Sequence, residues 1–312
     1  MIMLLTGLLS AAVLAGGVLS LAALGEVMAE RTGVTDLGVE GLMSMGAATA
    51  ILTVMFVPNP WIGFLAAMAA GSAGGLLFAF ATVIMRANQV LCGLAVTFLG
   101  LGFSAAIGHS VAGIPAPVSF AAVKIPLLSD IPVIGPAFFS QNLPVYLIYI
   151  ILPLGFHVLL FHTRHGLNLR AVGENPAAAD AAGISVTAIR FWYVVLGAAL
   201  AGGAGAYLSL AVIPNWSEGM VAGRGWIAVA LVIFAGYRPL NASLAGLIFG
   251  LISAVGFLGQ ARDWPIAAPV LNMSPYLGTL GFIILPVMLW PRLRRLFAAP
   301  ASLGMPYYRE ER

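Results

Sequence analysis

Long runs of apolar residues, separated by short polar stretches, fill most of this 312-residue chain. A helix needs about 20 mostly apolar residues to cross a bilayer, because it rises about 1.5 Å per residue through a core about 30 Å thick. By this measure the pattern predicts about nine crossings, with eight to ten allowed by glycines and prolines near their ends. They are residues 2–25, 37–57, 60–85, 90–110, 144–162, 188–213, 223–237, 240–259 and 274–290. The seventh is short and is interpreted as a full crossing, a half-helix or a re-entrant segment.

Composition supports a membrane class. Hydrophobic residues make up 61% of the chain and charged residues 8%, whereas soluble domains carry about 25% charged residues. The prediction is therefore an all-α polytopic membrane protein, with residues 1–312 forming one transmembrane domain. The first 25 residues lack a basic start and a small-residue cleavage site, so we expect a retained crossing and not a signal peptide.

Basic residues set the expected orientation, because cytoplasmic loops of membrane proteins are enriched in Lys and Arg. If the N-terminus is outside, eleven arginines are cytoplasmic and three basic residues lie outside. The cytoplasmic set is Arg31, Arg86, Arg164, Arg170, Arg190, Arg238, Arg292, Arg294, Arg295, Arg309 and Arg312. The outside set is Lys124, Arg224 and Arg262. This split predicts an outside N-terminus, a cytoplasmic tail at 291–312 and an odd number of crossings.

Two connections between crossings are long. Residues 111–143, predicted to be outside, contain many prolines, which remove backbone donors and favour a shaped loop over a long helix. Residues 163–187, predicted to be cytoplasmic, contain a short helix signal: Asn175 as N-cap, Pro176 in the first turn and Gly183 as the stop. We therefore expect a short surface helix at 175–183.

Small residues suggest tight packing and an internal repeat. Gly71 with Gly75, and Gly246 with Gly250, form G-x-x-x-G pairs, which let helix backbones approach closely in lipid. Arg31-Thr32-Gly33 precedes a Gly- and Ala-containing crossing, and Gly223-Arg224-Gly225 precedes another of opposite direction. An inverted repeat would produce this arrangement.

The chain lacks the residues of an ATP-hydrolysing site. It has no G-x-x-x-x-G-K-[ST] segment, and its only lysine is Lys124, in a predicted outside loop. Its single cysteine, Cys92, cannot form an internal disulfide, and His162 and His165 are expected at the membrane edge and not as a metal pair. We predict no catalytic residues, metal or cofactor in this chain, no nucleic-acid partner, and ATP bound by another subunit if ATP drives it.

Polar residues at the ends of the crossings are the candidate substrate-pathway residues. The centres of the predicted crossings contain no Asp, Glu, Lys or Arg, which argues against a proton-driven carrier and favours a neutral solute. Asp36 and Glu40 begin the second crossing, Asn88 and Gln89 open the fourth, and Arg224 opens the seventh. Each could instead be an interfacial anchor, and the two carboxylates could bind backbone groups of neighbouring helices.

Four segments carry a family resemblance. Residues 30–41, ERTGVTDLGVEG, resemble the E-R-x-G-x-x-N-x-G-x-E-G signature of bacterial ABC permeases of the ribose, branched-chain amino acid and nucleoside branch, with Asp36 in place of Asn. Residues 87–94, ANQVLCGL, are similar to a segment of the nucleoside-type group. Residues 166–176, GLNLRAVGENP, resemble that group's cytoplasmic coupling loop, and residues 223–230, GRGWIAVA, its second-half signature. The segments occur in family order over nearly the whole chain.

The resemblance implies a multi-pass permease in the bacterial cytoplasmic membrane, paired with a second permease that is a paralogue or an identical chain. It also implies an extracytoplasmic binding lipoprotein of the basic-membrane-protein type and a cytoplasmic ATPase. The ATPase would contact the coupling loop, whose candidate residues are Arg170, Glu174, Asn175, Pro176, Asp180 and Gly183. Nucleosides are the expected cargo. The alternatives are an ABC permease for simple sugars, a secondary carrier for a neutral solute, and a membrane enzyme or assembly protein.

Overall fold

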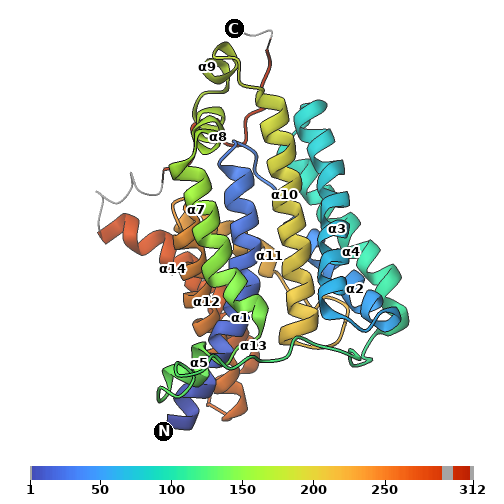
Figure 1. Ribbon diagram of the computed structural model, residues 1–312, viewed down its shortest axis with the longest axis vertical. Coiled ribbons are helices and arrows are strands. Elements are labelled where there is room, and N and C mark those ends of the chain that lie inside the picture. Colours follow the sequence, from blue (N-terminus) through green and yellow to red (C-terminus); the bar gives the residue numbers. More distant parts are fainter. Residues whose placement is uncertain (1, 290–297, 310–312) are drawn as a thin grey trace.

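The computed structural model describes residues 2–289 and 298–309 (Figure 1). This part of the chain is helical, and it contains no strand beyond two isolated bridges, Ala112 with Trp216 and Ala122 with Asn142. Four arginines assigned to the cytoplasm from the sequence lie outside the described residues: Arg292, Arg294, Arg295 and Arg312.

Seven of the nine predicted crossings are helices long and apolar enough to cross a membrane. In chain order they are α1 (Ile2–Glu30), α2 (Val39–Phe56), α3 with π-turn η1 (Pro60–Ile84), α4 with turn η2 (Gln89–Val111), α6 through η3 to α7 (Leu143–His162), α10 with π-turn η4 (Val186–Val212) and α12 (Pro239–Ala261). The other two are shorter: α11 (Arg224–Phe234) has 11 residues and α14 (Ser274–Leu289) has 16. Residue 290 of the ninth predicted crossing lies outside the described part. The α11 helix has the length of a half-helix.

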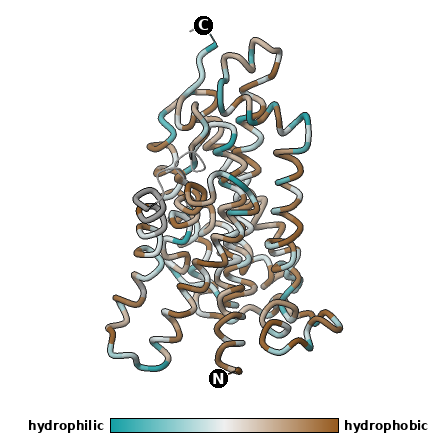
Figure 2. The backbone as a smooth tube through the Cα atoms, turned by 90° about the vertical axis from the view of Figure 1, so that its left-hand side faces the viewer, coloured by the Kyte–Doolittle hydropathy of each residue, from teal (hydrophilic) through white to brown (hydrophobic). Residues whose placement is uncertain are grey.

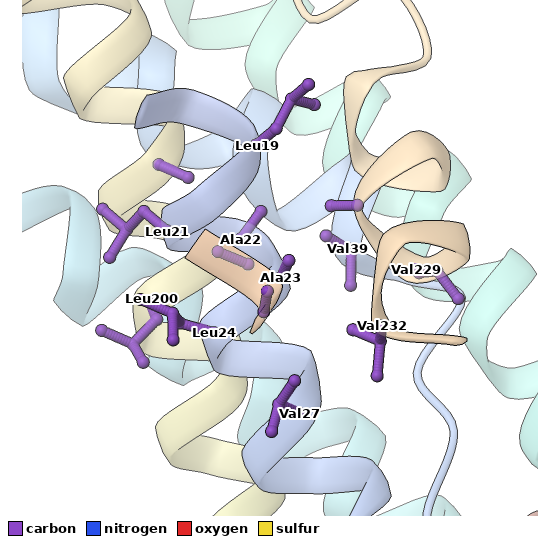
Figure 3. Packing of buried hydrophobic residues seen from close by; sticks show 14 of the residues in the cluster. Leu19, Leu21, Ala22, Ala23, Leu24, Val27, Val39, Leu200, Val229 and Val232 are labelled. Atoms are coloured by element: carbon purple, nitrogen blue, oxygen red, sulfur yellow. The ribbon is translucent and has the colours of Figure 1, made fainter. Parts of the chain in front are cut away.

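Helices α1 and α10 form the centre of the bundle. Every residue is buried over 16–30 of α1 and over 197–207 of α10, as expected for helices that are apolar on all sides. In Figure 3, Leu24 of α1 lies beside Leu200 of α10, while Val232 of α11 lies on the other side of α1. The remaining long helices therefore pack around this pair.

The two G-x-x-x-G pairs lie at close helix contacts, as their composition suggests. A Cβ atom on Gly71 of α3 would collide with the backbone of Gly202 in α10. A Cβ atom on Gly250 of α12 would collide with the backbone of Gly16 in α1. The other glycine of each pair, Gly75 or Gly246, faces the same partner helix. Thus α3 packs against α10, and α12 packs against α1, through small residues.

Two segments fold back into the protein before a helix begins. Residues 31–38 return along the end of α1 and lead into α2, and residues 213–223 follow η4 and lead into α11. Arg31 donates from Nε to the carbonyl oxygen of Tyr237 (2.7 Å), so the end of α11 lies beside the end of α1. Because 11 residues span about 16 Å, α11 has roughly half the length needed to cross a bilayer core of about 30 Å.

The polar connections lie at opposite ends of the bundle. The N-terminus and residues 111–143, whose longest helix is the five-residue α5 (Ile134–Phe138), share one end (Figure 1). The other end holds α8 (Arg164–Glu174), α9 (Pro176–Ala181) and residues 298–309, and much of the hydrophilic colour in Figure 2 lies there. Helix α8 was not predicted, although Thr163 caps it by accepting a hydrogen bond from the Gly166 N–H (3.0 Å).

We predict that Gly71→Ala destabilises the protein by about 1–3 kcal/mol, because the new methyl group would force α3 away from α10. Thermal unfolding of the purified protein in detergent measures this as a lower melting temperature. The matched control is Gly102→Ala in α4, where a Cβ atom has nothing within 4 Å. Equal melting temperatures for the two variants would contradict the assigned contact.

Candidate functional site

The start of α11 is bound by one carboxylate from α2. The Gly223 N–H donates to Glu40 Oε1 (2.7 Å) and the Gly225 N–H donates to Glu40 Oε2 (2.7 Å). Gly223 adopts φ +78°, and a Cβ atom on Gly225 would lie 2.5 Å from Glu40 Cα. Glycine at these two positions therefore allows a close approach, in which a negative charge faces the positive end of the helix dipole.

Arg224 lies between those two glycines and lines a cavity. Its Nη1 donates to the carbonyl oxygens of Met220 (2.8 Å) and Val221 (3.0 Å) in the preceding turn. The cavity has a volume of about 330 Å³ and lies between α1, α11, α12, α13 (Ala268–Asn272) and α14. Tyr276 also lines it and donates its hydroxyl to the Ala222 carbonyl oxygen (2.7 Å). The structure thus brings Glu40 and Arg224 together beside this partly open cavity.

Asp36 holds the first fold-back against α1. Its N–H donates to Glu26 Oε1 (2.8 Å), and its own Oδ1 accepts from the Gly38 N–H (2.7 Å). Asp36, Glu26 and Glu30 are all buried, and Glu30 Oε2 has no hydrogen-bond partner in the described residues. Burial raises the pKa of Asp36 to about 7, against a smaller lowering effect of the Gly38 N–H. Burial therefore favours the protonated form of Asp36.

Asn88 and Gln89 contact backbone groups. Asn88 caps α4 by accepting a hydrogen bond from the Leu91 N–H (3.0 Å). Gln89 is buried, and its Oε1 accepts from the Thr35 N–H in the first fold-back (2.9 Å). In this structure both side chains stabilise chain geometry, and neither lines the cavity beside Arg224. Their role in a substrate pathway stays a prediction.

The predicted surface helix is present as α9. The Asn175 side chain accepts from the Ala178 N–H (3.0 Å), Pro176 occupies the first turn, and Gly183 follows with φ +81°. The Arg170 guanidinium lies 5.2 Å from the Phe161 ring centroid. The start and end signals predicted for this helix are therefore confirmed, while its contact with an ATPase stays a prediction.

A segment near the C-terminus, residues 298–309, lies over α8 and α9, and we refer to it as the C-terminal strap. The Ala301 N–H donates to Glu174 Oε2 (3.3 Å). Asp180 Oδ2 accepts from the Tyr307 hydroxyl (2.8 Å) and forms an ion pair with Arg309 Nε (3.2 Å). Two of the predicted coupling residues are thus bound by the strap.

Arg190 of α10 joins the strap to the first fold-back. Its Nε donates to the Thr32 carbonyl oxygen (3.0 Å), Nη1 to the Met305 carbonyl oxygen (2.9 Å) and Nη2 to Ser302 Oγ (2.9 Å). The strap also donates directly, from the Gly304 N–H to the Gly33 carbonyl oxygen (3.1 Å). From the sequence, Arg190 was used only to predict the orientation of the chain. A buried arginine in an apolar helix requires several hydrogen-bond acceptors, and this requirement could have identified Arg190 as a structural contact.

The sequence of this chain matches one family of membrane transport proteins. The family described as branched-chain amino acid transport system / permease component matches residues 8–283. The chain belongs to this permease family. It is therefore the membrane permease component of an ABC transporter, and its seven apolar helices fit a multi-pass membrane protein.

Three relatives match nearly end to end. A putative glucose ABC transporter permease of Haloferax volcanii is 37% identical over 97% of this chain and 98% of its own length. A guanosine ABC transporter permease of Bacillus subtilis is 35% identical over 94% of both chains. A nucleoside ABC transporter permease of Lactococcus lactis is 34% identical over 92% of both chains.

We predict that Asp36→Asn flattens the pH dependence of stability. The fold raises the pKa of Asp36 from 3.8 to about 7, so it favours the protonated acid, and the stability gained below pH 4 is lost as the pH rises through 7. A neutral amide avoids that loss. The variant should melt several degrees above the wild type at pH 8 and close to it at pH 4.

The measurement is a series of melting curves in detergent from pH 4 to pH 8. Glu26 contacts Asp36 and remains in both proteins, so the difference between the two curves reports the Asp36 carboxylate together with its effect on Glu26. Asp130→Asn, at an exposed site in the 111–143 loop, is the control and should follow the wild type. Parallel curves for Asp36→Asn and the wild type would contradict the assigned pKa.

Proposed function

We propose that this chain forms one half of the translocation pathway of an ABC importer for nucleosides. The observation that carries the proposal is the site at the start of α11, where Glu40 binds two backbone N–H groups and Arg224 lines a cavity. Discontinuous helices that meet near the bilayer centre are typical substrate sites in transporters. The guanosine and nucleoside permeases among the relatives support this class of cargo.

A simple sugar is the second candidate cargo. The observation that favours it is the 37% identity with the putative glucose permease over nearly the whole chain. Sugars and nucleosides are both neutral and rich in hydroxyl groups, so hydroxyl and amide side chains can bind either. The aromatic residues of the cavity, described below, favour a nucleoside.

The proposed topology places the N-terminus and residues 111–143 outside a bacterial cytoplasmic membrane, with α8, α9 and the strap inside. Two observations support this orientation. The two polar ends lie at opposite ends of the bundle, and the end with α8 and α9 holds most of the predicted cytoplasmic arginines that the structure describes. In this proposed topology the shorter helices α11 and α14 are also counted as passes, which makes nine with the seven long helices.

An inverted repeat, with α1 to α4 as one half and α10 to α14 as the other, also belongs to this proposal. In each half a long central helix is followed by a fold-back, a helix with a glycine N-cap (Gly38 or Gly223), and a helix with a G-x-x-x-G pair. The pair of each half packs on the central helix of the other half. In this proposed repeat Gly38 corresponds to Gly223, whereas the sequence motif paired residues 31–33 with residues 223–225.

Coupling to ATP hydrolysis is proposed to run through α9. A cytoplasmic ATPase, on a separate subunit, would receive α9 in a surface groove and move it as ATP binds. The strap gives this motion a path, since it contacts α9 at Asp180 and reaches the first fold-back at Gly33. That fold-back continues to Glu40, and Glu40 binds the start of α11.

The proposed complex has three further components: a second permease subunit, the ATPase and an extracytoplasmic substrate-binding lipoprotein. Support comes from the relatives, because Lactococcus lactis has two proteins named as nucleoside ABC transporter permeases that both match this chain. Haloferax volcanii likewise has two matching proteins named for glucose. We therefore propose a heterodimer of related permeases.

The coupling proposal predicts that Gly183→Val and Glu174→Arg reduce substrate uptake at least tenfold while ATP hydrolysis continues. Valine cannot adopt φ +81° without strain, so the end of α9 would shift, and arginine at 174 would lose the bond from the Ala301 N–H. Uptake and ATPase activity are measured on the same reconstituted complexes. Gly155→Val, at a helical site with nothing within 4 Å, is the control, and wild-type coupling in both test variants would refute the contact.

The cargo proposal predicts that cells lacking this chain lose uptake of labelled guanosine. Restoring the gene should restore uptake, and unlabelled nucleosides should compete better than glucose. Loss of glucose uptake alone would support the sugar permease instead. Uptake that stops with an ionophore while cellular ATP stays high would indicate a secondary carrier.

A further inference from the structure

We propose that the cavity beside Arg224 is a nucleobase subsite, and that it selects purine nucleosides with a carbonyl group at C6 over those with an amino group. This inference rests on the proposed function and adds the part of the cargo that is recognised. The cavity of about 330 Å³ falls within the size range of small-molecule sites. Its described lining residues include one arginine and no carboxylate.

The free edge of Arg224 is the main recognition element. Only Nη1 of this half-buried side chain makes hydrogen bonds within the described residues, to Met220 and Val221. These bonds fix the guanidinium and leave the Nε–Nη2 edge with two parallel donors. Arginine donors in this arrangement match the O6 and N7 acceptors of guanine or hypoxanthine. Adenine presents an amino donor at C6, which cannot accept from the same edge.

Two aromatic side chains give the cavity surfaces for stacking. Phe257 and Tyr276 both line it and retain 55% and 45% of their surface exposed. The Tyr276 hydroxyl donates to the Ala222 carbonyl oxygen (2.7 Å), which holds the ring beside the start of α11. Planar bases stack on such rings in many proteins, whereas a simple sugar lacks a π face.

Hydroxyl groups complete the lining. Ser274 Oγ is buried without a hydrogen-bond partner in the described residues, although it borders the cavity. An unpaired buried hydroxyl is unfavourable, and a ribose hydroxyl at this position would remove the cost. Ser253 Oγ donates to the Phe249 carbonyl oxygen (3.0 Å) and can still accept a bond from the cargo. The cavity therefore offers base and ribose contacts together.

The test compares uptake of labelled inosine and adenosine by the complete transporter, with its ATPase and binding protein, in proteoliposomes. We expect the wild type to prefer inosine, and Arg224→Gln to reduce that preference about tenfold or more. Arg262→Gln removes an exposed positive charge at the end of α12 and leaves the cavity intact, so it should keep the wild-type ratio. An unchanged ratio in Arg224→Gln would refute the subsite.

A second measurement does not depend on the folding of an Arg224 variant. Cys92 is the only cysteine, so Cys92→Ser gives a background in which Ala222→Cys, at an exposed position that lines the cavity, can be labelled by a methanethiosulfonate reagent. Millimolar inosine should slow that labelling at least fivefold, and adenosine should slow it less. Labelling of Ser110→Cys, at an exposed site near the end of α4, should not respond to either nucleoside.

The outcomes separate the two proposals. Nucleoside uptake with an unprotected Ala222→Cys and an unchanged preference would refute the subsite and leave the proposed cargo standing. Uptake of glucose without any nucleoside uptake by the wild type would refute both. Equal protection by inosine and adenosine would refute the selectivity assigned to Arg224.

Discussion

A single carboxylate joins the two fold-backs of this permease. Glu40 follows the first fold-back, and its oxygens accept from Gly223 and Gly225 where the second fold-back becomes α11. In an apolar interior each of these groups would be costly without its partner. The exposed backbone at the start of α11 and the charge of Glu40 therefore stabilise each other. Because these groups belong to separate helices, the relative position of α2 and α11 follows from this one interaction.

Small residues also let α2 pack closely against α4 and α10. Gly41 of α2 lies against Gly100 of α4, and Gly46 lies against Gly202 of α10. In lipid the hydrophobic effect does not draw helices together, so close backbone contact supplies much of the attraction. Helix surfaces made of glycine carry no side chains that interlock, so such helices can slide or tilt against each other with little steric cost. A permease that alternates between conformations needs contacts of this kind, which are tight and still carry few interlocking side chains.

Hydrophobic length predicted seven helices closely, since the cost of burying polar groups in lipid leaves few other choices. The cap of α9 was also readable, because Asn175, Pro176 and Gly183 act through local geometry. Helix α8 and the strap were missed, since their stability depends on contacts between distant segments. The same limit applies to the site: Glu40 and Arg224 were selected for polarity, but their common location depends on the fold. Asp36, Asn88 and Gln89 carry the same polarity signal, and in this structure they bind backbone groups of the turns around them.

The strap has a practical consequence for anyone who purifies this protein. Arg309 forms an ion pair with Asp180 beside α9, and Tyr307 donates its hydroxyl to the same carboxylate. An affinity tag or fluorescent fusion joined directly after Arg309 would begin next to α8 and α9 and compete for the space around them. The N-terminus lies at the opposite end of the bundle (Figure 1). A tag at that end would leave the strap with its native neighbours.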